Sequence, residues 1–378
     1  LLEGVGPIHI NLQFDEPLLP DGAYEWLDGI KVQQLTKPSR VAATITPTTR
    51  KNIVIVGHDR AGFSVERIEK LAQDLGAPIV AEDPLSFGSA VAHTPIILSD
   101  ERARDALKPE LLVVIGRTTL SRSINAYISS APYVMVIDPR LEIIDTARSA
   151  AETHHEVPNL TSPISKDDSW FELWAKYESR AAQSLESLPE WCEARVAATI
   201  AQELESDTAL FISSSRPIRD FEAFAQPRSS LVTYANRGLA GIDGNISTAL
   251  GIATHHDETV AVLGDLAFLH DISALTNPTK DALTIIVIDN DGGGIFSTLP
   301  QRNQPGFDRI FGTPHGKDLA KIVAGFEISH EVVRSAKELH IAMQRIHPGL
   351  HIIIAKMPHR EANADSIAEV SKRYSMLL

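Results

Sequence analysis

The stretch GDLAFLHDISALTNPTKDALTIIVIDNDGGGIFSTLP, from Gly264 to Pro300, says most about the fold and the chemistry of this chain. Asp265 follows one apolar run, and Asn290 follows the next run 25 residues later. A helix-like segment separates the two. If both runs are neighbouring parallel strands, Asp265 and Asn290 lie side by side at the carboxyl edge of the sheet, where open α/β sheets bind ligands.

These residues predict a site for Mg²⁺ and a diphosphate group. A carboxylate oxygen, an amide oxygen and the backbone carbonyls of a glycine-rich turn suit a hard divalent cation that also holds phosphate oxygens. Gly-Asp after a strand is also common as a turn, and Asp265 could cap the helix that follows. The glycine run Gly292–Gly294 favours the ligand site, because three glycines lose backbone entropy on folding and bring no packing in return.

Apolar runs alternate with helical patterns along most of the chain, which predicts the α/β class. Strands are expected at Ile53–Gly57, Leu111–Gly116 and Tyr133–Asp138, with a helix over Ser64–Leu75. The alternation restarts after Leu188-Pro189. We therefore expect two doubly wound parallel-sheet domains. Residues 21–190 hold a linker (Asp21–Lys51) and the first domain, and residues 191–378 hold the second, preceded at residues 1–20 by a strand (Ile8–Leu12) and a turn.

The first of these domains lacks the dinucleotide fingerprint. Its first turn, Gly57 to Gly62, does not have the glycine spacing that lets a backbone approach a pyrophosphate. We expect a spacer domain that holds no cofactor.

Composition narrows the range of partners. The chain has 378 residues and a net charge of −14, which argues against nucleic acid or an anionic membrane as the main partner. Its apolar runs have strand length, so no membrane-spanning helix is expected. A single cysteine, Cys192, excludes an internal disulfide and fits a reducing, cytoplasmic compartment.

Taken together, the motifs resemble those of the thiamine-diphosphate enzymes, whose diphosphate-binding domain carries GD, a spacer slightly longer than this one, and then NN or a variant. Here Asp289 replaces the first Asn. NDGGGIF and the upstream NRGLAGIDGNISTALG (Asn236–Gly251) are similar to the 2-succinyl-5-enolpyruvyl-6-hydroxy-3-cyclohexene-1-carboxylate (SEPHCHC) synthase family of menaquinone biosynthesis. The opening GPIHINLQFDEPL (Gly6–Leu18) resembles the point where that family leaves its first domain.

The resemblance implies a cofactor, a metal and their residues. Thiamine diphosphate would bind with Mg²⁺ or Mn²⁺, the metal held by Asp265, Asn290 and the Gly292 carbonyl. Ile242 matches the apolar side chain under the cofactor that brings its two rings together, although on base rates alone it would be a core residue. Ile295 and Phe296 match positions near the reacting centre. The implied cofactor-binding set is Gly264, Asp265, Asn290, Gly292, Gly293 and Ile242.

The resemblance also implies two substrates that carry carboxylates, 2-oxoglutarate and isochorismate. Arg219, Arg237 and Arg122 follow predicted strands on presumed loops, and arginine binds carboxylates in a bidentate manner. Ser215 matches a neighbouring polar contact. An isolated surface arginine is more often a solvated charge. Ser121 stands where the family often has a basic residue, which leaves the role of Arg122 open.

The histidines add little. The adjacent pairs His154-His155 and His255-His256 have no metal-ligand spacing with a carboxylate. His315 lies in an irregular loop after the glycine run and is a further residue that could line the site.

The family activity would be decarboxylation of 2-oxoglutarate and addition of the succinyl unit to isochorismate. Another thiamine-dependent 2-oxoacid decarboxylase or an acetolactate-synthase-like enzyme is one alternative, and a catalytically silent assembly fragment is another. In the family a pyrimidine-binding domain precedes the matched region and brings the ring-activating glutamate. We therefore expect a homodimer or homotetramer whose activity requires that domain.

Overall fold

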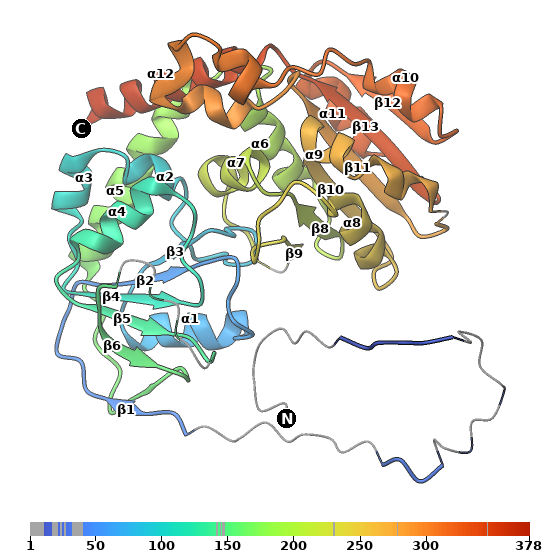
Figure 1. Ribbon diagram of the computed structural model, residues 1–378. Coiled ribbons are helices and arrows are strands. Elements are labelled where there is room, and N and C mark those ends of the chain that lie inside the picture. Colours follow the sequence, from blue (N-terminus) through green and yellow to red (C-terminus); the bar gives the residue numbers. More distant parts are fainter. Residues whose placement is uncertain are drawn as a thin grey trace.

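The computed structural model describes residues 11–16, 22, 25, 28–31, 41–140, 143, 145, 148–229, 231–277, 279–345 and 347–378. Within this part of the chain, two all-parallel sheets each carry helices on both faces (Figure 1). The predicted α/β class is confirmed. The strand predicted over Ile8–Leu12 lies largely outside the described residues, and Asn11 and Leu12 form no strand.

The first sheet has five strands in the order β3-β2-β4-β5-β6. They span Asn52–Val56 (β2), Ile79–Ala81 (β3), Leu111–Ile115 (β4), Val134–Ile137 (β5) and Ala150–His154 (β6). Strands β2 to β5 are fully buried, as expected of a parallel sheet covered on both faces. Strand β6 was not predicted, because its alternately exposed sequence AAETH has no apolar run.

Helices cover both faces of this first sheet. They span Val65–Asp74 (α1), Thr94–Ile97 (α2), Glu101–Ala106 (α3), Arg122–Ser130 (α4) and Asp168–Ser184 (α5). Helix α1 begins at the N-cap Ser64, close to the predicted start. It packs on one face of the sheet, and the other helices pack on the opposite face.

The second sheet has six strands in the order β12-β13-β11-β10-β8-β9. They span Ala209–Ile212 (β8), Val232–Tyr234 (β9), Thr259–Gly264 (β10), Leu283–Asp289 (β11), Ser329–Val333 (β12) and Leu350–Lys356 (β13). The edge strand β12 was not predicted. Its sequence SHEVV is half exposed and carries a histidine and a glutamate, so its apolar signal is weak.

The helices of the second sheet form two layers. They span Glu193–Glu203 (α6), Arg216–Phe224 (α7), Asn245–Ala253 (α8), Asp265–His270 (α9), Leu319–Ala324 (α10), Ala336–Met343 (α11) and Arg360–Leu377 (α12). Helices α6, α7 and α11 share one core with the sheet, and α8 and α10 share the core on the other face. Within the described residues, no helix is both long and apolar enough to cross a membrane.

Short elements complete the fold. The strands Thr44–Ile45 (β1) and Asn159–Leu160 (β7) pair with each other. Five short helical turns span Leu185–Ser187 (η2), Ile272–Thr276 (η3), Gly294–Thr298 (η4), Pro300–Asn303 (η5) and Asp308–Gly312 (η6). The last three form the irregular stretch after the glycine run.

The final helix, α12, joins the two halves of the molecule. It lies beside α5, and its residues Val370 and Tyr374 are buried in the same core as Trp170 and Trp174 of α5 (Figure 1). The C-terminal residues therefore help to build the core of the first sheet. The division of the chain near residue 190 stays a prediction.

Candidate cofactor and metal site

The carboxyl ends of β10 and β11 bring Asp265 and Asn290 together. The register pairs Gly264 with Ile288, so both strands end at the same edge of the sheet. The backbone N–H of Asn290 donates to Asp265 Oδ2 at 3.2 Å, and that of Gly292 donates to the same oxygen at 2.8 Å. The Leu266 N–H donates to Asp265 Oδ1 at 2.6 Å. The strand-end carboxylate thus organises the start of the glycine loop.

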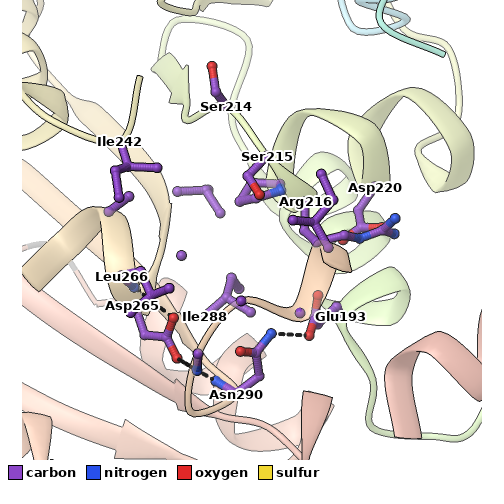
Figure 2. Close-up of a pocket in the computed structure, with 18 of the residues that line it drawn as sticks. Glu193, Ser214, Ser215, Arg216, Asp220, Ile242, Asp265, Leu266, Ile288 and Asn290 are labelled. Carbon is purple, nitrogen blue, oxygen red and sulfur yellow. Dashed lines mark hydrogen bonds and ion pairs between the residues drawn. The ribbon is translucent and has the colours of Figure 1, made fainter. Parts of the chain in front are cut away.

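Asn290 has its amide oriented by a buried acid. Its Nδ2 donates to Glu193 Oε1 at 2.6 Å (Figure 2). Its Oδ1 is buried and has no hydrogen-bond partner. Because an unpaired buried acceptor carries a desolvation cost, this oxygen indicates a site for a cation or a donor.

The glycine loop packs closely against the η6 segment. Gly292 has φ +131°, and a Cβ there would lie 2.2 Å from the Gly312 carbonyl oxygen. At Gly264, in contrast, a Cβ would meet nothing within 4 Å. The loop therefore needs Gly292 for backbone geometry, and Gly264 leaves open space beside Asp265.

A cavity of about 200 Å³ opens over this edge of the sheet (Figure 2). Every predicted site residue except the three arginines lines it: Ser215, Ile242, Gly264, Asp265, Asn290, Gly292, Gly293, Ile295 and Phe296. Ile242 is half-buried and faces the cavity, so it is not an ordinary core residue. Ser215 has φ +75°, an unfavourable backbone conformation of the kind that collects at functional sites.

The three predicted arginines do not line this cavity. Arg219 is in α7 and Arg122 is the first residue of α4, so neither lies on a loop as predicted. Helix α4 begins directly after Ser121, whose side chain caps it, and α7 begins directly after Ser215, which makes no side-chain cap. Arg122 is exposed.

Arg237 forms an ion pair with Glu82 of the first sheet's domain, and both side chains are buried. Its Nε and Nη1 atoms are buried without a hydrogen-bond partner. Arg219 Nη1 donates to the Ser215 carbonyl at 2.6 Å. Burial lowers the pKa of Arg219, and the nearby Arg216 and Arg237 lower it further. The arginines that gather near the site are thus Arg216, Arg219 and Arg237.

A buried group of charged residues on α6 and α7 was missed from the sequence. Glu193 and Asp220 line the cavity, and Arg216 forms an ion pair with Asp220 one helical turn away. Burial, and then repulsion from Asp220, raises the pKa of Glu193 to about 7. The i, i+4 spacing of Arg216 and Asp220, which suits an ion pair on a helix, is a sequence signal that could have found part of this group.

His315 lies beside the Asp265 carboxylate but does not line the cavity. Its Nε2 lies 3.3 Å from Asp265 Oδ2 and 3.7 Å from carboxylate oxygens of both Asp289 and Asp291. The hydrogen bond to Asp265 raises the pKa of His315 despite its burial. Ligand atoms of Asp265, Asp289 and His315 lie close enough together to hold an ion.

The donors at this edge fit a thiamine diphosphate–metal group. A buried carboxylate, an unpaired amide oxygen and open space at Gly264 provide hard oxygen ligands beside room for phosphates. Apolar side chains, among them Ile242 and Ile295, line the remainder of the cavity.

Comparison with known proteins agrees with this geometry. A family model described as the middle domain of thiamine pyrophosphate matches residues 23–212. A second, the C-terminal TPP-binding domain of thiamine pyrophosphate enzymes, matches residues 217–354.

Curated relatives carry the name 2-succinyl-5-enolpyruvyl-6-hydroxy-3-cyclohexene-1-carboxylate synthase. The protein from Saccharopolyspora erythraea is 31% identical over 94% of this chain and 67% of its own length. The one from Thermobifida fusca is 34% identical over 92% of this chain and 66% of its own length. The chain therefore spans about two thirds of the length of these relatives.

Proposed function

This chain belongs to the SEPHCHC synthase family of thiamine pyrophosphate enzymes, and we propose that its cavity binds thiamine diphosphate with Mg²⁺ or Mn²⁺. The reaction we propose is decarboxylation of 2-oxoglutarate and addition of the succinyl unit to isochorismate. The bound cofactor supplies the electron sink that this carbon–carbon chemistry requires. The chain supplies orientation, metal ligands and charge.

The observation that carries this proposal is the unpaired Asn290 Oδ1 beside Asp265. Asp265, Asn290 and the Gly292 carbonyl would hold the metal. Glu193 would keep the Asn290 oxygen turned to the metal, because it accepts from the amide nitrogen. Gly264 and Gly293 would lie beside the diphosphate, where no side chain obstructs it.

The apolar residues have a positioning role in this proposal. Ile242 would support the two rings of the cofactor from below. Ile295 and Phe296, on η4, would form a wall near the reacting centre and exclude water from it. All three line the cavity.

Substrate carboxylates would bind at Ser215, Arg219 and Arg237. The support is that two guanidinium nitrogens of Arg237 are buried without a partner even though Glu82 pairs with a third. Such donors carry a desolvation cost that a carboxylate would relieve. Arg122 is exposed and does not line the cavity, so the proposal does not depend on it.

The assembly and location follow from family membership alone. A homodimer or homotetramer in the cytoplasm stays a prediction. So does the requirement for the family's pyrimidine-binding domain, which can be tested by comparing the turnover of these residues with and without that domain from a relative.

Titration calorimetry tests the binding proposal. Thiamine diphosphate should bind only with Mg²⁺ or Mn²⁺ present. Binding by Asp265→Ala with unchanged Mg²⁺ dependence would show that the metal ligands are assigned incorrectly.

A kinetic assay of the chain joined to the pyrimidine-binding domain tests the substrate assignment. Arg219→Ala should lower kcat/KM for 2-oxoglutarate or isochorismate. The expected decrease corresponds to a loss of roughly 1.5–3 kcal/mol of transition-state stabilisation, the value of one charge-assisted contact. An unchanged kcat/KM for both substrates would contradict the assignment.

A further inference from the structure

A second cluster of potential metal ligands lies at the opposite edge of the second sheet. Glu331 is on β12, His351 is the second residue of β13, and His347 is in the segment that leads into β13. The register pairs Ser329 with His351, so Glu331 and His351 project from the same face of the sheet. Asp265 and Asn290 follow the carboxyl ends of β10 and β11, whereas His351 is near the amino end of β13.

The potential ligand atoms face one another. Glu331 Oε1 lies 3.4 Å from His351 Nε2. The rings of His347 and His351 stack with centroids 3.6 Å apart and planes 10° apart. One ligand atom from each residue lies within 4.8 Å of the other two.

These atoms make no hydrogen bond of normal geometry, and Glu331 Oε1 and His351 Nε2 meet only in the 3.4 Å contact. Glu331 Oε1, His347 Nε2 and His351 Nε2 are all buried and unpaired, and the whole His351 residue is only 2% exposed. Each of these buried polar atoms carries a desolvation cost, and the three lie within 4.8 Å of one another. An ion held among them would offset that cost once the stacked rings of His347 and His351 turn their nitrogens toward it.

Neighbouring groups already hold two of the residues in ligating form. Ser329 Oγ lies 2.9 Å from His351 Nδ1, so a proton on Nδ1 leaves the lone pair on Nε2. Arg345 Nη1 donates to Glu331 Oε2 at 2.9 Å and leaves Oε1 free. Outer contacts of this kind orient the ligands of known metal sites.

We propose that Glu331, His347 and His351 bind one divalent transition metal of the zinc class. Two imidazole nitrogens and one carboxylate oxygen suit Zn²⁺, whereas Mg²⁺ prefers oxygen ligands throughout. The Arg345 guanidinium offsets the Glu331 charge, so affinity depends on coordination by nitrogen, and this further disfavours Mg²⁺. The bound ion ties the edge strand β12 to β13 and to the segment before it.

Glu331 and His347 are each partly exposed, which gives the ion a route from solvent and leaves positions for water.

Metal titration of this chain tests the proposal. The protein is kept in excess Mg²⁺, which occupies the oxygen-rich site at Asp265, and is titrated with Zn²⁺ by calorimetry and with Co²⁺ by visible absorption. We expect one equivalent of Zn²⁺ to bind and a Co²⁺ absorption band of a nitrogen-ligated ion. His347→Gln and Glu331→Gln should each weaken binding by on the order of 100-fold or more.

His340→Gln is the matched control, because His340 lies on α11 and pairs with Glu203 outside the cluster. It should bind Zn²⁺ as the unchanged protein does. Asp265→Asn should also still bind one equivalent of Zn²⁺, and this result would distinguish the proposed zinc site from the cofactor site. Zn²⁺ should raise the melting temperature of the unchanged protein but not that of His347→Gln.

Two outcomes would overturn the proposal. Absence of Zn²⁺ binding would leave the cluster a packed polar group only. Equal binding by the unchanged protein, His347→Gln and Glu331→Gln would place the ion elsewhere. Both substitutions are at partly exposed positions and keep a polar side chain, so a folded variant is expected for each readout.

Discussion

The two parallel sheets of this protein have the same kind of topology but different carboxyl edges. In the first sheet the chain closes its own strand ends. A Cβ at Gly57 would lie 1.5 Å from the Arg117 carbonyl oxygen, and one at Gly116 would lie 2.0 Å from that of Asp59. In the second sheet, a Cβ at Gly264 would meet nothing within 4 Å. Glycine thus serves close backbone contact in the first sheet and open space in the second.

The strand-end acids differ in the same way. Asp59, after β2, is neutralised by Arg140 at 2.7 Å and by Arg117 at 3.4 Å. Asp265, after β10, receives backbone N–H groups and His315, and no lysine or arginine of the described residues pairs with it. A strand-end aspartate therefore indicates a cation site only where no lysine or arginine side chain of the same protein pairs with it.

The largest expected effect concerns the ion pair between Glu82, just after β3 of the first sheet, and Arg237, just after β9 of the second. Arg237→Ala leaves Glu82 buried without its partner, which should destabilise the fold by about 3–5 kcal/mol. Urea unfolding measures this difference. Adding Glu82→Gln to Arg237→Ala should recover part of the loss. An unchanged unfolding midpoint for Arg237→Ala would mean that the ion pair with Glu82 does not stabilise the fold.

The second prediction separates the two strand-end aspartates. Asp265→Ala should weaken Mg²⁺-dependent binding of thiamine diphosphate by at least about 100-fold, since it removes the charged ligand. Asp59→Ala, the matched change in the first sheet, should leave that binding unchanged. Calorimetry of both variants gives the result, and equal losses would remove the distinction between the two edges.

The third prediction tests the closed edge itself. Gly116 has φ +68° and a close carbonyl, whereas Gly62 has φ +86° and open space. Gly62→Ala should cost only the backbone strain, about 1 kcal/mol, and Gly116→Ala about 2–3 kcal/mol because a clash is added. Thermal unfolding measures both. Equal costs would show that the loop moves easily out of the way.

The smallest effect is a pH dependence at the contact between the domains. His93 is buried, with Nδ1 2.8 Å from the Ala223 carbonyl oxygen and Nε2 2.9 Å from Gln226. Burial lowers its pKa. The unfolded chain therefore binds a proton more readily, and stability should fall below about pH 6.5, by up to roughly 1.4 kcal/mol per pH unit.

Unfolding of His93→Gln between pH 5 and 8 provides the measurement. This variant should lose that part of the pH dependence, and His255→Gln, at an exposed histidine, should keep it. The same slope in both variants would assign the effect to other groups.

Local sequence was enough to predict most of the second sheet. The apolar run before Asn290 became the buried strand β11. The GD and glycine signals depend on adjacent residues and on parallel register, so Asp265 and Asn290 could be paired from the sequence. Strands β6 and β12 could not, because edge strands have one exposed side and little apolar periodicity.

By itself, the sequence determined the α/β class and the family, and it paired Asp265 with Asn290 at one edge of the sheet, because hydrophobic periodicity and short motifs are local properties. Only the tertiary structure showed that Glu193 orients Asn290 and that Glu82 pairs with Arg237. It alone brought Glu331, His347 and His351 together. Each of these contacts joins separate elements, and the packing of those elements decides which polar atoms are left buried without a partner.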